Sequence, residues 1–171
     1  LLQGFHEVYP GIELYLKIMN THDAGQAITE GAADLGVVED DVSTPAFTLL
    51  PAAEDQLVVV SATPVTDLAA AKGVMRERGS GTRAVLEQAL DRVGIVPDVR
   101  MELPSNEAVR AAVIAGSGVS ALSRLVVKVP LAAGQLVEID VPIPPRRFYA
   151  LRPDQRHVSR AAQAFLDYVL K

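Results

Sequence analysis

The stretch RERGSGTRAVLEQAL, residues Arg76 to Leu90, runs from a charged, glycine-rich loop directly into a helix. Gly79, Ser80, Gly81 and Thr82 lie where that helix should begin. The backbone N–H groups of a helix's first turn have no partner within the helix, so such a loop can bind an anion. Many ordinary helices begin in the same way, and the surrounding chain has to distinguish the two interpretations.

The composition is that of an ordinary globular protein, with 49% hydrophobic and 22% charged residues among 171. The length permits one large domain or two smaller ones. Cysteine is absent, which excludes disulfides and thiolate sites and fits a reducing compartment. No apolar run approaches the roughly 20 residues that a membrane helix needs. We therefore expect no membrane association and a cytoplasmic location.

The charge balance argues against DNA binding by this segment. The formal net charge is −5 and the basic residues are scattered, whereas a nucleic-acid-binding domain usually carries a basic face. The first ten residues, LLQGFHEVYP, read as the back half of a helix without a start methionine, cap or signal peptide. This beginning predicts that the segment belongs to a longer chain.

Hydrophobic periodicity predicts helices alternating with strands along the whole chain. The alternation in IELYLKI predicts a strand, and the nearly continuous apolar run ADLGVVE predicts a buried parallel strand. The predicted helices are 1–9, 23–30, 83–93, 105–115, 124–133 and 159–170, and the predicted strands are 12–18, 33–39, 47–53, 57–62, 73–77, 99–103, 119–123, 135–141 and 147–151.

The alternation occurs twice, before about residue 60 and again after it. Two apolar strands, near 57–62 and 146–151, connect the halves. We therefore predict an α/β fold of two Rossmann-like subdomains joined by two crossover strands, with a ligand cleft between them. Subdomain I comprises residues 1–60 and 146–171, and subdomain II comprises residues 61–145.

The sequence offers little for catalysis or metal binding. It shows no catalytic triad, no Walker-type loop and no GxGxxG fingerprint. The histidines His6 and His157 read as surface residues, and His22 as a solvent-facing or capping residue. Glu39-Asp40-Asp41 reads as a solvated loop rather than a cation site. We expect neither an enzyme nor a cofactor.

Small polar residues recur at three strand-to-helix junctions: Asn20-Thr21, Ser80-Gly81-Thr82 and Ser105-Asn106. Each set alone is explained as a helix N-cap. In a sheet of this kind, however, all three junctions lie at the carboxyl ends of strands, where ligands bind. Their recurrence in both halves favours a shared ligand site.

The order of these motifs resembles the effector-binding domain of LysR-type transcriptional regulators. The pieces that carry the resemblance are FHEVYPGIEL (5–14), GAADLGVV (31–38), RERGSGTR (76–83), SNEAVRAAVIAGSGVSALS (105–123) and GQLVEI (134–139). The combination is specific, although no single piece is. RERGSGTR followed by SNEAV is similar to the branch typified by regulators of cysteine biosynthesis and carbon fixation.

The resemblance implies a fold like the type II periplasmic binding proteins, with subdomain I lacking its first strand. It implies a small-molecule effector, an anion or a carboxylate, that controls transcription allosterically. DNA would be bound only through a winged helix-turn-helix that is not in this chain. The regulatory domains would form homodimers, and the full protein tetramers. The alternative is a periplasmic solute-binding protein of a transporter with the same fold.

The resemblance also implies an effector site. Ser80 and Thr82 match hydroxyls that contact the effector in this family. The remaining expected contacts are Asn20, Thr21, Gly81, Ser105, Asn106, Val119 and Ser120. Arg83 is either an anion partner or a structural salt bridge, and Arg147 either reaches the cleft or braces the hinge.

Overall fold

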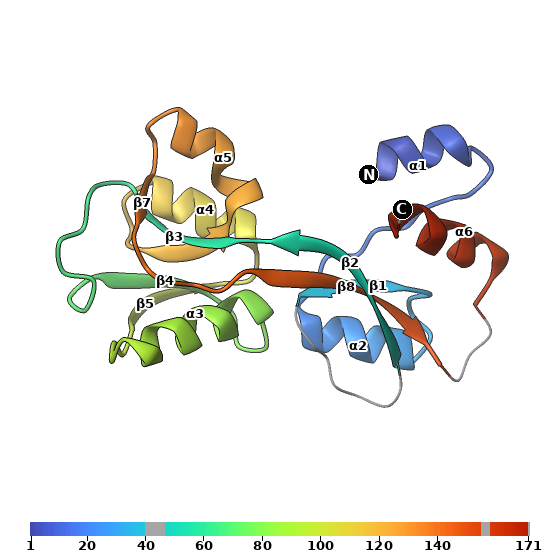
Figure 1. Cartoon of the computed structure of the whole chain (residues 1–171), viewed down its shortest axis with the longest axis horizontal. Coiled ribbons are helices and arrows are strands. Elements are labelled where there is room, and N and C mark those ends of the chain that lie inside the picture. Colours follow the sequence, from blue (N-terminus) through green and yellow to red (C-terminus); the bar gives the residue numbers. More distant parts are fainter. Residues whose placement is uncertain (40–46, 155–157, 171) are drawn as a thin grey trace. The chain divides into compact units, whose positions relative to one another are not determined.

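The structure is a computed structural model that describes residues 1–39, 47–154 and 158–170. Asp40, Asp41 and His157 lie outside the described residues. The helices are α1 (Leu2–Val8), α2 (Thr21–Thr29), α3 (Gly81–Arg92), α4 (Asn106–Ile114), α5 (Arg124–Ala132) and α6 (Arg160–Val169). The strands are β1 (Gly36–Glu39), β2 (Phe47–Asp55), β3 (Leu57–Ser61), β4 (Lys72–Arg76), β5 (Asp98–Leu103), β6 (Ser120–Ser123), β7 (Val137–Ile139) and β8 (Arg146–Pro153) (Figure 1).

The chain divides into two compact units. Unit 1 contains Leu1–Ala53 and Arg147–Lys171, and unit 2 contains Glu54–Arg146. The chain therefore passes between the units after Ala53, within β2, and after Arg146, within β8. The expected crossover strand near 57–62 is instead β3, which belongs wholly to unit 2, because all five of its residues are buried in that unit's core.

Strand β3 organises the core of unit 2. It pairs antiparallel with β6 on one side and with β7 on the other. Side chains alternate between the two faces of a strand, and here both faces are covered. Leu57 and Val59 face a cluster that includes Leu86 of α3. Val58 and Val60 face a second cluster with Val109 of α4, so the sheet lies between helices on both sides (Figure 1).

A glycine permits the close approach of two backbones next to β4. The N–H of Val119 donates to the carbonyl of Lys72 at 2.8 Å, and Val119 forms a parallel bridge with Gly73. Gly118, with φ +154°, immediately precedes this contact. A Cβ at Gly118 would lie 2.1 Å from the Lys72 carbonyl oxygen, so only glycine fits there.

Unit 1 has a smaller core. Its three-stranded sheet has the order β1-β8-β2, and β1 pairs antiparallel with β8. Ile28 of α2, Val38 of β1 and Leu151 of β8 form the buried centre. Elsewhere in the unit, the ring of Phe5 in α1 contacts the ring of Phe165 in α6 edge to face, with centroids 5.0 Å apart.

Two predictions about unit 1 are wrong. Residues 12–18 form no strand, and Tyr15 and Ile18 are 87% and 85% exposed. Alternating side chains make a stable strand only when a neighbouring strand and a packed face are present, and none of the described strands pairs with this segment. The strand β1 is antiparallel rather than parallel, and its Val37 is half exposed.

Candidate functional site

The parallel pair β4 and β5 brings two of the predicted junctions to one edge of unit 2. Arg76, the last residue of β4, lies opposite Leu103, the last residue of β5. The loop that leads to α3 and the turn that leads to α4 therefore begin side by side. The carboxyl edge of a parallel sheet is where ligands bind in α/β proteins, and we take this edge as the candidate site.

The loop before α3 has the geometry of an anion-binding helix start. Gly79 has a φ of +88°, a conformation that favours glycine, and Ser80 occupies the N-cap position. The carbonyl of Ser80 accepts from the N–H of Ala84 at 3.1 Å, but its hydroxyl makes no hydrogen bond to the helix. The N–H groups of Gly81 and Thr82 lie in the first turn, where the helix supplies no acceptor.

Thr82 belongs to a buried polar network. Its hydroxyl oxygen accepts from Nη1 of Arg146 at 3.0 Å, and Arg146 donates through Nε and Nη2 to Oδ2 of Asp55 at 2.8 and 2.6 Å. The other carboxylate oxygen of Asp55 accepts from the Ser123 hydroxyl at 2.6 Å. The side chains of Asp55 and Arg146 are only 1% and 3% exposed.

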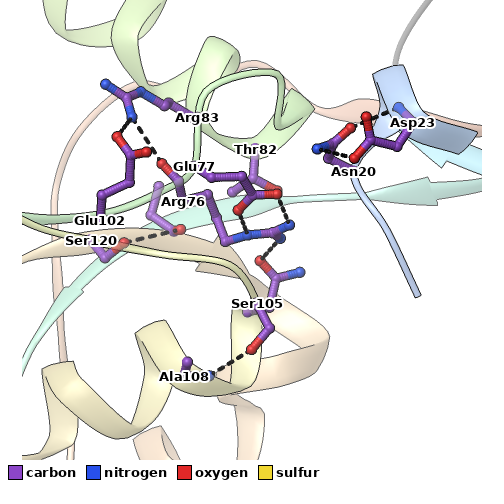
Figure 2. A network of polar contacts seen from close by, with 12 residues as sticks. Asn20, Asp23, Arg76, Glu77, Thr82, Arg83, Glu102, Ser105, Ala108 and Ser120 are labelled. Carbon is purple, nitrogen blue, oxygen red and sulfur yellow. Dashed lines mark hydrogen bonds and ion pairs between the residues drawn. The ribbon is translucent and has the colours of Figure 1, made fainter.

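A second network holds Asn106, the first residue of α4 (Figure 2). Arg76 donates to both carboxylate oxygens of Glu77, at 2.8 and 2.9 Å, and to Oδ1 of Asn106 at 2.7 Å. The oxygen of Asn106 is thus occupied by Arg76. Ser105 acts as the N-cap of α4, because its hydroxyl accepts from the N–H of Ala108 at 3.1 Å.

Arg83 has structural partners on two sides. It donates to Glu87 at 2.7 Å. On its other side it donates to Glu102 at 2.5 Å and to the carbonyl of Arg76 at 3.1 Å (Figure 2). The hydrogen bond to Glu87, against the opposing effect of burial, raises the pKa of the Arg83 guanidinium above its usual value. The geometry favours the structural salt bridge among the two interpretations of this residue.

The positive charges in and around the loop before α3 are unequally compensated. Arg76 is paired with Glu77, Arg83 with Glu87 and Glu102, and Arg146 with Asp55. Arg78 is exposed, and within the described part of the chain it has no ion-pair partner. Arg78 thus contributes an uncompensated positive charge next to the start of α3, where the helix dipole also favours an anion.

The remaining predicted residues lie elsewhere. In unit 1, Asn20 caps α2 by accepting from the N–H of Asp23 at 2.8 Å, and Thr21 is the first residue of that helix. In unit 2, Val119 pairs with Gly73 near the amino end of β4, and Ser120 lines a small, mainly apolar cavity with Val119 and Met75. Arg147 is exposed at the start of β8.

Sequence reasoning missed Asp55, Ser123 and Arg146. Asp55 is a charged residue two positions before the wholly buried strand β3, and that position is the signal that could have identified it. Its partner Arg146 is 91 residues away along the chain. Since no local pattern connects residues at that separation, the pairing appears only in the folded unit.

We also searched residues 1–39, 47–154 and 158–170 for a metal centre and for a helix that could span a membrane. In that part of the chain, no group of three or more His, Asp or Glu side chains is placed to hold a metal ion. None of the helices found there has the length and apolar content to cross a membrane.

The chain is an α/β protein of two units with a polar helix start at the carboxyl edge of a parallel strand pair, and its fold is that of the type II periplasmic-binding-protein-like class. The sequence model of the LysR substrate binding domain matches residues 1–171, and the chain belongs to that family. The family and fold class expected from the sequence are therefore confirmed.

Individual relatives of the chain include transcriptional regulators. The chain is 38% identical to an uncharacterized HTH-type transcriptional regulator, YeiE of Escherichia coli, over 98% of this chain and 61% of the relative. It is 34% identical to the HTH-type transcriptional regulator CbbR of Rhodospirillum rubrum, over 99% and 60%. The regulatory domain of Synechocystis CcmR, solved in complex with 2-PG, superposes with a TM-score of 0.85 at 31% identity, over 99% of this chain and 87% of that one. The chain thus spans about three fifths of the length of these two regulators.

Proposed function

We propose that this LysR substrate binding domain binds a small anionic effector at the Gly79–Thr82 loop. The observation that carries the proposal is the start of α3, where a Ser80 hydroxyl without a capping bond accompanies the N–H groups of the first turn. The uncompensated charge of Arg78 favours an anion at the same place. CcmR, whose regulatory domain was solved with 2-PG, supports an effector of this kind.

The proposed contact residues differ in whether their hydrogen-bonding groups already have partners in the protein. Ser80 and the backbone of Gly81 have donors that the helix does not use, and Thr82 lies next to them with a hydroxyl held by Arg146. Ser105, Asn106 and Arg83 already bond to other protein groups. We therefore propose these three as supports of the loop. Asn20, Thr21, Val119, Ser120 and Arg147 stay expectations from the family resemblance.

We propose that the whole protein is a cytoplasmic transcriptional regulator and not an enzyme. Units 1 and 2 would serve as its two regulatory subdomains, and an additional N-terminal winged helix-turn-helix would bind DNA. Homodimers would form through the regulatory domains and tetramers in the full protein. The relatives YeiE and CbbR are HTH-type regulators, which disfavours a transporter's solute-binding protein. Sequence preceding Leu1 distinguishes the two, since an export signal there would contradict the regulator.

The effector would act by shifting populations. A ligand that binds one conformation of the domain more tightly than another shifts the equilibrium by its difference in affinity. A coupling of about 1–3 kcal/mol is typical between two sites of one protein. The amides and hydroxyl at the start of α3 can supply such a difference, because they bond the anion only when the first turn of the helix is formed.

A thermal-shift screen tests the proposed site with 2-PG, inorganic phosphate and sulfate. A ligand at 100 times its Kd stabilises the domain by about 2.7 kcal/mol, which raises the Tm of a protein this size by about 5–11 °C. The Ser80→Ala/Thr82→Val variant should lose this response relative to its own ligand-free Tm. Ser159→Ala, which removes the cap of α6, is the matched control and should keep it.

Two results refute the proposed site. The first is the absence of any shift for the unsubstituted domain with all three anions. The second is a shift that survives in the Ser80→Ala/Thr82→Val variant. Loss of the response in Ser159→Ala as well would show that the variants act through general stability, and it would also count against the site.

A further inference from the structure

The buried ion pair of Asp55 and Arg146 stands where the chain enters and leaves unit 2. Asp55 is the second residue of the unit, and Arg146 is its last. Three hydrogen bonds join their side chains to each other and to Thr82, at 2.6, 2.8 and 3.0 Å. The pair thus fastens the two ends of the unit to each other and to the first turn of α3.

Stability alone does not account for this pair. Moving two charges out of water costs free energy. Replacing a buried ion pair by apolar residues of similar volume therefore often leaves the stability of a folded protein unchanged. What a buried guanidinium provides is geometry, because its planar fork fixes several acceptors at once. Here the acceptors include the Asp55 carboxylate and the Thr82 hydroxyl.

The network also reaches α5. The Ser123 hydroxyl donates to Oδ1 of Asp55 at 2.6 Å and accepts from the N–H of Leu125 at 3.2 Å, which caps that helix. Asp55 therefore connects the end of β2 with the starts of α3 and α5. A displacement of Thr82 at the start of α3 can reach the crossing after Arg146 through the Arg146 side chain. It can reach the crossing before Asp55 through Arg146 and Asp55 together.

We propose that Arg146 is a positioning residue of the effector site, which fixes the Thr82 hydroxyl and couples occupancy of the Gly79–Thr82 loop to the two chain crossings beside Asp55 and Arg146. The role rests on the proposed function, since the loop is taken as the place where the anion binds. Arg146 itself need not touch the ligand. Its contribution is to hold Thr82 in the orientation that the ligand requires.

Arg146→Lys tests this role, because lysine keeps the charge and loses the fork. Arg124→Lys is the matched control: Arg124 also lies in unit 2, and its ion pair with Glu138 is exposed. Two quantities are measured for each variant. One is the hydrogen-exchange rate of the Ala84 amide, the first backbone bond of α3, without ligand. The other is the Kd for 2-PG, or for phosphate if 2-PG does not bind.

We expect Arg146→Lys to accelerate exchange at Ala84 and to raise the Kd, each by about five- to 150-fold, the usual range of coupling between two sites. Arg124→Lys should change neither. In the Thr82→Val background the Arg146→Lys substitution should raise the Kd little further, because the hydroxyl that Arg146 positions is already gone. Bound ligand should also slow exchange at the amides of Gln56 and Phe148, next to the crossings.

The outcomes separate the two proposals. If the unsubstituted domain binds neither anion, the proposed effector site fails, and exchange at Ala84 alone decides whether Arg146 positions the helix start. If the domain binds but Arg146→Lys leaves the Kd unchanged, the positioning role is overturned and the site stands. If Arg146→Lys does not fold, Thr82→Ser and Thr82→Val decide: equal Kd values for these two would overturn the role of the hydroxyl.

Discussion

Substituting Asp55 by asparagine should strongly destabilise the domain. The asparagine side chain has nearly the same volume but no charge, so the Arg146 guanidinium, 3% exposed, would stay buried without the Asp55 carboxylate beside it. Breaking a buried pair by removing one partner costs about 3–5 kcal/mol. For a protein of this size that loss lowers the Tm by about 6–20 °C. Urea unfolding followed by circular dichroism measures the free energy of unfolding directly.

The control is Glu138→Gln, which removes the charge from an ion pair in the same unit. Arg124 and Glu138 are 50% and 40% exposed, so water can hydrate the Arg124 guanidinium once the charge of Glu138 is gone. Exposed pairs contribute about 0–1 kcal/mol. The reasoning is refuted if Asp55→Asn costs no more than Glu138→Gln. The double variant Asp55→Leu/Arg146→Met should recover most of the loss, because it removes both charges of the buried pair.

Three further contrasts use pairs of similar substitutions, each compared by thermal unfolding. Gly118→Ala should lower the free energy of unfolding more than Gly116→Ala. Both glycines have positive φ, for which backbone strain alone costs about 1–2 kcal/mol. Only a Cβ at Gly118 would also meet the Lys72 carbonyl oxygen, at 2.1 Å. Equal losses would contradict the close approach. Leu122→Ala, at a fully buried position, should cost about 2–5 kcal/mol, and Leu125→Ala, at a position 74% exposed, less than about 0.5 kcal/mol. Ser105→Ala should cost about 1 kcal/mol by removing a cap, whereas ligand-free Ser80→Ala should cost less, since the buried Ser80 hydroxyl makes no cap bond. A large loss in Ser80→Ala would show that its hydroxyl serves the fold.

The elements of unit 2 were largely predictable because their signals are local and agree with one another. Ser105 caps α4 as predicted, and the apolar run of β3 is buried throughout. In unit 1 the same kind of signal misled. The segment 12–18 alternates like a strand, but pairing depends on a neighbour that periodicity does not reveal.

The candidate site was predictable only in part. The glycine-rich sequence identifies the start of α3, and Ser80 and Thr82 both belong to it. The bonding of each hydroxyl did not follow from sequence. Thr82 bonds to Arg146, which is 64 residues away. The set Ser80-Gly81-Thr82 alone reads as an N-cap, but the Ser80 hydroxyl at the N-cap position makes no cap bond. Side-chain pairing at such separations depends on the assembled sheet.

The most direct test of the account is an amide chemical-shift titration of the isotopically labelled domain with 2-PG and, separately, with inorganic phosphate. Binding at the start of α3 predicts that the largest changes occur at the amides of Ser80, Gly81 and Thr82, with smaller changes at Arg83 and Asn106. Changes that leave these amides unaffected and gather elsewhere, such as at the start of α2, would contradict the proposed site, as would a spectrum that neither anion alters.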